Sequence, residues 1–165
     1  MKILISMLAS GIFLLSCSNQ NDKMTKAESD NIINEVSACY DKLSEYSSKA
    51  QLDFFMSYYD NSPDFLSISA DGKRSDYQEF KKLCGEYYSG LEKQTLITTQ
   101  QKLQIIEKNL VIVSWTGNIT AYLKNGDTIK MNNYSITSLF KKTDGKWKII
   151  YDHESALPPE IIKNE

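Results

Sequence analysis

The stretch LVIVSWTGNITAYLKNGDTIK, residues 110–130, decides the class of fold. Its first part alternates apolar and polar side chains, the apolar set being Val111, Val113, Trp115, Ile119 and Ala121. Because neighbouring side chains on a β-strand point to opposite faces, this alternation predicts a strand over residues 110–123 with one buried face. The Asn125-Gly126 pair that follows is a strong signal for a tight hairpin turn. We therefore expect the chain to return as an antiparallel strand over residues 128–142.

Further strands are expected on both sides of this hairpin. Residues 95–107 are rich in Thr, Ile and Leu, which favours a long strand before it. After it, Asp144-Gly145 predicts another turn and residues 147–155 a last strand. Gly117 lies in the middle of a strand and predicts a bend there. The C-terminal half is therefore expected to form a bent antiparallel sheet.

The N-terminal half has the residue spacing of helices. Residues 26–48 are predicted to form the first helix, because apolar residues recur every three or four positions on one face. These residues are Ile32, Val36, Tyr40 and Leu43. A second, shorter helix is expected over residues 51–59, and Asn61-Ser62-Pro63-Asp64 should end it, since a proline disfavours helix at the preceding residue. A short strand is expected at residues 65–69.

A third helix is predicted from the capping residues Asp76 and Glu79, which stand three positions apart. It should end at Gly90, because glycine is the usual residue at a helix C-terminus. Three helices followed by a run of long strands predict an α+β domain with the helices on one face of the sheet.

The order of these elements and the residues at the turns between them resemble the nuclear transport factor 2-like superfamily, and more narrowly its SnoaL-like branch. The resemblance rests on residues 52–59, on residues 63–72, and on residues 144–155, which contain DGKWKII and HES. It implies a cone-shaped, strongly bent antiparallel sheet wrapped over three N-terminal helices, with a pocket between them, over residues 25–160. Enzymes of this superfamily include isomerases, dehydratases and cyclases, and other members only bind or dimerise. The resemblance thus implies where a pocket lies and leaves its chemistry open.

The N-terminus is typical of an exported bacterial lipoprotein. A single Lys2 precedes a short apolar run, which fits a signal peptide over residues 1–16 and is too short to cross a bilayer. Leu14-Leu15-Ser16-Cys17 resembles a lipobox, which implies cleavage before Cys17 and its lipidation. Residues 17–24 would then form a lipidated, polar tether, and the protein would be anchored to a membrane of the bacterial cell envelope on its extracytoplasmic side. The alternative is an ordinary signal peptide that ends near a cysteine.

Composition argues against several classes of function. The formal net charge is −2 and the few lysine pairs are isolated, so no nucleic acid partner is expected. His153 is the sole histidine, and with Cys17 lipidated too few ligands remain for a metal site. No cofactor is expected. Cys39 and Cys84 both fall on apolar helical faces, which favours two free thiols, and a disulfide between them is the alternative in an exported protein.

Candidate site residues come from the last strand and the end of the second helix. If alternation continues from Trp147, then Tyr151 and His153 face the pocket, while Asp152 and Glu154 are solvated. One β-bulge would reverse this assignment. The expected ligand-binding residues are Tyr59, Tyr134, Tyr151 and His153.

Catalytic candidates are His153, whose ordinary pKa lies near neutrality, and Asp60, which follows the second helix. The alternatives are a structural histidine at the sheet end and, for Asp60, a helix C-terminus that runs into a polar loop. Three functions stay open: binding of a small apolar or amphipathic molecule or a partner protein, which we favour; an isomerase-, dehydratase- or cyclase-type enzyme using His153; and a non-catalytic structural protein that forms a homodimer.

Overall fold

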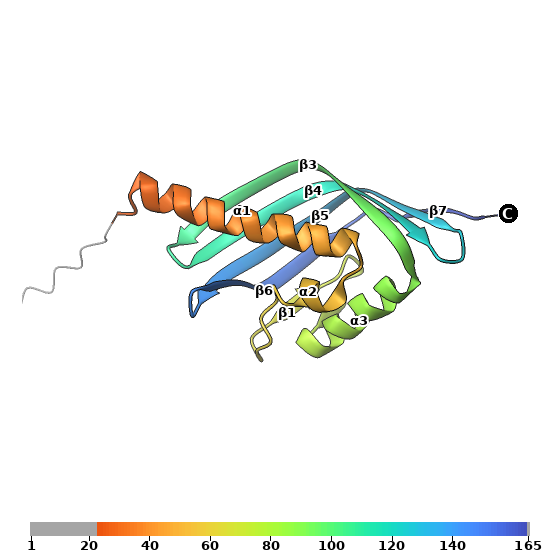
Figure 1. The fold of residues 1–165 in the computed structure, drawn as a ribbon, viewed down its shortest axis with the longest axis horizontal. Helices are drawn as coiled ribbons and strands as arrows, with labels where there is room; N and C mark the ends of the chain where they lie inside the picture. The colour runs from red at the N-terminus through yellow and green to blue at the C-terminus, as the bar shows by residue number, and fades with distance from the viewer. Residues whose placement is uncertain (1–22, 165) are drawn as a thin grey trace, which may run out of the picture.

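A computed structural model describes residues 23–164 (Figure 1). The predicted signal peptide over residues 1–16 and the lipidation site Cys17 lie outside the described residues. Within the described part of the chain, no helix has both the length and the apolar character needed to span a bilayer. The described chain runs from an N-terminal helix to a C-terminal strand at the opposite end of the molecule (Figure 1).

The N-terminal half contains three helices, as predicted. Helix α1 (Lys26–Ser48) starts with a capping box, in which the Glu28 backbone N–H donates to Thr25 Oγ1 at 3.2 Å and the Thr25 N–H donates to Glu28 Oε2 at 2.8 Å. Helix α2 (Leu52–Met56) is shorter than expected. Helix α3 (Tyr77–Gly90) is capped by Asp76, which accepts from the Glu79 N–H at 2.9 Å.

The strands form one sheet. Its members are β1 (Leu66–Ile68), β2 (Arg74–Ser75), β3 (Leu91–Glu107), β4 (Leu110–Leu123), β5 (Thr128–Thr143), β6 (Lys146–Ser155) and β7 (Glu160–Ile162). The strand order is β2-β1-β6-β5-β4-β3, and β7 pairs with the first residues of β5. The α+β class and the bent sheet over three helices are confirmed (Figure 1). The sheet is mixed, however, because β1 pairs with β6 in parallel.

The sheet bends where regular pairing is interrupted. The pairing of β4 with β5 shifts between Gly117 and Ile119, and Asn133 on β5 adopts a φ of 53° while its N–H donates to Asn118 Oδ1 at 3.0 Å. A side chain at position 117 would collide with the Ile97 carbonyl oxygen and the Trp115 ring. The bend predicted at Gly117 therefore has a steric basis.

A second interruption lies between β5 and β6. Leu139 pairs with Tyr151 and Phe140 pairs with Ile149, so Ile150 is an extra residue on β6. Such a bulge changes which residues of the strand face the helices. On β6, Trp147 and Ile149 are buried before the bulge, and Asp152 is buried after it.

The core lies between the concave face of the sheet and the helices. Most of the predicted core residues are buried, namely Ile32, Val36, Leu43, Phe80, Val113, Trp115, Phe140 and Trp147. The apolar pattern of the sequence also predicts Phe54 in this core. This prediction is wrong, since its side chain is 58% exposed. Helix α2 turns Phe55 and Met56 inward in its place, and Phe54 stacks on Tyr46 at the surface.

Candidate functional site

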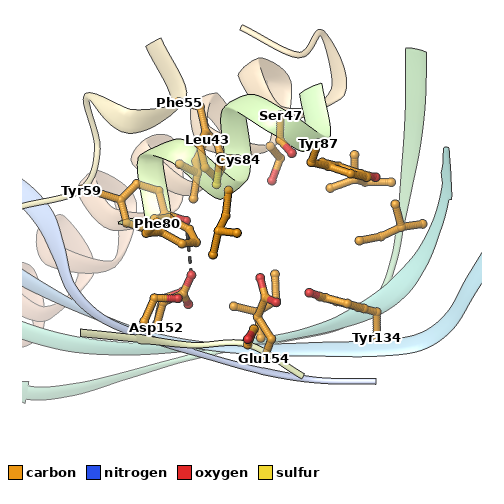
Figure 2. Close-up of a pocket in the computed structure, with 18 of the residues that line it drawn as sticks. Leu43, Ser47, Phe55, Tyr59, Phe80, Cys84, Tyr87, Tyr134, Asp152 and Glu154 are labelled. Carbon is orange, nitrogen blue, oxygen red and sulfur yellow. Dashed lines mark hydrogen bonds between the residues drawn. The ribbon is translucent and has the colours of Figure 1, made fainter. Parts of the chain in front are cut away.

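A cavity of about 340 Å³ lies between the sheet and the helices (Figure 2). Helices α1, α2 and α3 form one wall, and the inward residues of β1 to β6 form the other. Much of the lining is aromatic, from Tyr40, Phe55, Tyr59, Phe80, Tyr87, Tyr88 and Tyr134. Aliphatic side chains such as Leu43, Leu96 and Ile119 fill the gaps between the rings. The cavity is therefore mostly apolar, and its polar groups stand out.

Asp152 is the more buried of the two carboxyl groups in this lining. Its side chain is 2% exposed, and its Oδ1 accepts a hydrogen bond from Ser138 Oγ at 2.8 Å. Its Oδ2 accepts from the Tyr59 hydroxyl at 3.3 Å (Figure 2). Burial and, to a lesser degree, the nearby Glu154 raise the pKa of Asp152 to about 7, although the hydrogen bonds from Ser138, Tyr59 and the His153 backbone oppose the rise. The carboxyl can therefore gain or lose a proton near neutral pH.

Glu154 lies two residues further along β6 and faces the same cavity (Figure 2). Burial is also the main cause that raises the pKa of Glu154 above its ordinary value, and a hydrogen bond from Tyr134 opposes it. Asp152 and Glu154 thus form an acidic pair on one strand, each accompanied by a tyrosine hydroxyl.

Tyr59 is positioned by a short bridge between the loop after α2 and strand β6. The Asp60 N–H donates to the Ile149 carbonyl at 2.8 Å, and the Ile149 N–H donates to the Tyr58 carbonyl at 2.8 Å. This pairing turns the Tyr59 side chain inward, where its ring contacts Phe55 and other aromatic rings. Burial raises the pKa of Tyr59, so its hydroxyl remains a hydrogen-bond donor to Asp152.

The other end of the cavity carries neutral polar groups. Gln94 Nε2 donates to the Ser47 carbonyl at 2.8 Å and to Ser47 Oγ at 3.0 Å. The Tyr87 hydroxyl donates to Gln94 Oε1 at 2.8 Å, and the Tyr88 hydroxyl donates to Ser47 Oγ at 3.1 Å. These hydrogen bonds join α1, α3 and β3, and they leave this end without a charged group among the described lining residues.

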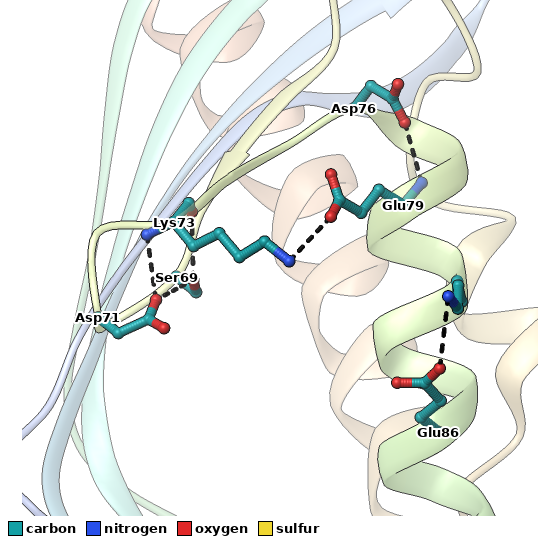
Figure 3. A network of polar contacts seen from close by, with 7 residues as sticks. Ser69, Asp71, Lys73, Asp76, Glu79 and Glu86 are labelled. Carbon is teal, nitrogen blue, oxygen red and sulfur yellow. Dashed lines mark hydrogen bonds and ion pairs between the residues drawn. The ribbon is translucent and has the colours of Figure 1, made fainter.

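Polar contacts join the hairpin of β1 and β2 to α3 (Figure 3). Asp71 Oδ1 accepts from Ser69 Oγ at 2.6 Å and from the Lys73 N–H at 3.0 Å, which orders the turn. Lys73 Nζ then pairs with Glu79 Oε1 on α3 at 2.9 Å. The hairpin contributes Ser69 and Ser75 to the cavity lining, so these contacts help to hold that wall in place.

Only part of the predicted set of site residues comes together. Tyr59 and Tyr134 line the cavity, whereas Tyr151, His153 and Asp60 are not among its lining residues. The prediction that Tyr151 and His153 face the cavity is wrong, because the bulge at Ile150 reverses the alternation. His153 is exposed and Tyr151 is half-buried on the opposite face of the sheet. Their roles as ligands or catalytic groups are not supported by these positions.

Asp152 and Glu154 are the functional candidates that alternation missed, since it predicted both as solvated. The pattern contains one signal for the reversal: Ile149 and Ile150 are adjacent apolar residues in a strand that otherwise alternates. Ser138 was missed too, because a serine on the long strand β5 has no distinguishing pattern. Its importance comes from pairing directly opposite Asp152.

Metal-binding chemistry gains no support from the described residues, which contain no group of three or more His, Cys, Asp or Glu side chains arranged around a common point. Cys39 and Cys84 are both free thiols. Cys84 lines the cavity, and burial raises its pKa to about 12, so it stays a neutral thiol. It contributes apolar surface to the cavity rather than a nucleophile.

Solved structures share the architecture of this chain, whereas no curated protein sequence matches it. The structure of a nuclear transport factor 2-like superfamily protein from Salmonella enterica serovar Typhimurium is similar, with a TM-score of 0.70 and 16% identity over 79% of this chain and 94% of that one. A hexachlorocyclohexane dehydrochlorinase, LinA-type3, from Novosphingobium barchaimii has a TM-score of 0.70 and 11% identity over 84% of this chain and 94% of that one.

A third similar structure is a proposed dehydratase of the same superfamily from Streptomyces avermitilis. It has a TM-score of 0.68 and 15% identity over 78% of this chain and 97% of that one. At these identities the likeness establishes the fold alone. The family model for the SnoaL-like domain, in contrast, matches residues 36–159, which include every strand that lines the cavity. The chain therefore belongs to the SnoaL-like domain family and has the fold of the nuclear transport factor 2-like superfamily.

Proposed function

We propose that this protein holds a small, largely apolar molecule in the cavity between its sheet and helices, while a lipid on Cys17 anchors it to the bacterial cell envelope. The observation that carries the proposal is the cavity itself. Its volume of about 340 Å³ falls within the range of about 300–1,000 Å³ that is usual for small-molecule sites. Aromatic and aliphatic walls with a few polar groups are also typical of such sites.

The burial of Asp152 supports a binding role. An ionisable group in an apolar wall lowers the stability of the fold, because its charged form loses hydration. Asp152 accepts hydrogen bonds from the side chains of Ser138 and Tyr59, and it borders open cavity space. Carboxyl groups with such shifted pKa values gather at functional sites. A bound polar group would offset part of the cost.

A cavity-filling substitution tests this proposal. Leu96 lines the cavity, whereas its neighbour Ile97 is 62% exposed on the other face of β3. Native mass spectrometry of the purified protein would report any ligand that co-purifies, and a fluorescent apolar probe would measure occupancy. Leu96→Trp should abolish probe binding, and Ile97→Trp should leave it unchanged. Equal binding by both folded variants would contradict a ligand site in this cavity.

A second candidate function is acid–base catalysis by Asp152. It is favoured by the position of a carboxyl with a pKa of about 7 beside the Tyr59 hydroxyl, a pair able to move a proton and stabilise a developing oxyanion. Similar structures include a dehydrochlorinase and a proposed dehydratase. For this chain the base would be Asp152, since His153 lies outside the cavity.

Deuterium exchange tests the catalytic candidate. Small enolisable ketones such as 2-tetralone would be incubated with the protein in D₂O, and deuterium at the α-carbon would be followed by mass spectrometry. Exchange above the buffer rate should increase as pH rises through about 7, because the base must be ionised. Asp152→Asn should remove it and His153→Ala should preserve it. Exchange that survives Asp152→Asn would exclude Asp152 as the base.

The structural, dimerising alternative predicts an apolar outer sheet face. The outward positions in the middle of β4 are polar, namely Ser114, Thr116, Asn118 and Thr120, whereas Ile112 and Tyr122 towards its ends are not. This polarity gives dimerisation through β4 little support, and a homodimer remains a prediction that the oligomeric state in solution would test.

A further inference from the structure

The charges that line the cavity are all of one sign. Asp152 and Glu154 face it from β6, and among its described lining residues there is no Lys, Arg or His. The other polar groups of the lining are hydroxyls, the Gln94 amide and the Cys84 thiol. Lys73, on the neighbouring hairpin, is paired with Glu79 outside the cavity. When the acidic pair ionises, no described lining residue supplies a counter-charge.

Aromatic rings surround the acidic pair. The Tyr59 ring lies 5.0 Å from the Phe80 ring, centroid to centroid, and both border the cavity near Asp152 (Figure 2). Tyr134 approaches from β5 with its hydroxyl toward Glu154 (Figure 2). The faces of aromatic rings attract cations, and rings grouped around a cavity recur in sites for organic ammonium groups. Such walls also accept the hydrocarbon part of a ligand.

We infer that the molecule held in this cavity is an organic cation, an alkylamine with an aromatic or aliphatic hydrocarbon part, whose ammonium group lies between Asp152 and Glu154. This inference rests on the proposed function and specifies its ligand class. The ammonium would supply the missing counter-charge, while its hydrocarbon part would occupy the region lined by Leu96 and Ile119. Carboxylic acids and phosphate esters would be rejected, because like charges at a buried site are strongly unfavourable.

The inference specifies a pH dependence. Titratable groups surround Asp152 on several elements. They are Glu154 on β6, Tyr59 after α2, Tyr40 on α1, Cys84 on α3 and Tyr134 on β5. Burial raises the pKa of each phenol and of the thiol, so these stay neutral up to alkaline pH. Asp71 and His153 act on Glu154 only as more distant charges. The two carboxyls therefore control binding, and affinity for a permanent cation should increase as they ionise.

Three probes of one shape separate ligand charge from ligand shape. Trimethyl(2-phenylethyl)ammonium is a permanent cation, 2-methyl-4-phenylbutan-2-ol is its neutral counterpart, and 3-phenylpropanoate is an anion. Calorimetry with the full-length protein in detergent, corrected by detergent alone, would measure each affinity at pH 5.5 and pH 8. At pH 8 the cation should bind at least about tenfold more tightly than the alcohol. At pH 5.5 the cation should bind less tightly than it does at pH 8. The anion should not bind.

Conservative substitutions test whether Asp152 and Glu154 cause the preference for the cation. Asp152→Asn and Glu154→Gln should each weaken the cation by about tenfold and leave the alcohol unchanged. Glu107→Gln, at an exposed position on β3, is the matched control. If Asp152→Asn does not fold, Glu154→Gln still decides. An alcohol that binds as well as the cation, or a preference that survives both variants, overturns the inference and leaves the pocket intact. If none of the probes binds, the proposed pocket function is itself contradicted.

Discussion

Replacing Asp152 with asparagine should make the protein more stable at alkaline pH and leave it little changed in acid. The side chain is 2% exposed, and its pKa of about 7 in the folded protein compares with 3.8 for an ordinary aspartate. Below pH 4 both the folded and the unfolded chain carry this carboxyl protonated. Between pH 4 and pH 7 the unfolded chain releases the proton and the folded chain retains it, so ionisation favours unfolding.

The size of the effect follows from this interval. One pKa unit corresponds to about 1.36 kcal/mol, so a rise from 3.8 to about 7 lowers the free energy of unfolding by about 4 kcal/mol across the interval. The loss is absent below pH 4 and complete above pH 7. The raised pKa of Glu154 adds a contribution of the same sign. An asparagine does not ionise, and its amide oxygen can still accept the hydrogen bond from Ser138.

Urea unfolding between pH 4 and pH 8.5, followed by the fluorescence of Trp115 and Trp147, measures this difference. The advantage of Asp152→Asn over the wild type should grow with pH and level off near 4 kcal/mol above pH 7. Glu107→Gln should follow the wild-type curve. Two parallel curves for wild type and Asp152→Asn would refute the reasoning, because they would mean that the folded protein ionises this carboxyl as easily as the unfolded chain does.

Three other outcomes are expected. Intact-mass analysis of membrane extracts should show loss of residues 1–16 and added acyl mass on Cys17, and Cys17→Ala should stay unprocessed or lose its anchor; unmodified wild-type protein in the soluble fraction would exclude the anchor. Trp115→Ala or Trp147→Ala should lower the unfolding free energy by about 3–5 kcal/mol in urea titrations, since both rings are buried. His153→Ala should change neither the thermal melt nor ligand binding, because the side chain is exposed; lost binding would return His153 to the site.

Much of the fold could be predicted because its signals are local. The helix over residues 26–48 was predicted with the bounds that the structure has, since its apolar spacing and its cap both lie within it. The strand over residues 110–123 was predicted equally well from its alternation. The short second helix was overestimated, because its last residues pair with Ile149 of β6, and a contact so distant in the sequence has no local signal.

The site was predicted less well than the fold. Tyr59 and Tyr134 were found because aromatic side chains at the end of a helix and along a strand are frequent in the lining of such a pocket. The acidic pair was missed because the prediction for β6 propagated alternation from Trp147 through Ile150. Since the side-chain period of a strand is two, one extra residue exchanges the inward and outward sets for everything beyond it.

The bulge at Ile150 accounts for both the shape of the cavity and its chemistry. Before the bulge, Trp147 and Ile149 fill the space under the helices with apolar side chains. Beyond it, a strand that continued in phase would place Tyr151 and His153 inward, and the cavity would contain a basic group and no carboxylate. The extra residue places Asp152 and Glu154 there instead, and an extra residue of this kind also bends the strand. The acidity of this pocket therefore depends on the same local irregularity that helps to curve the sheet around it.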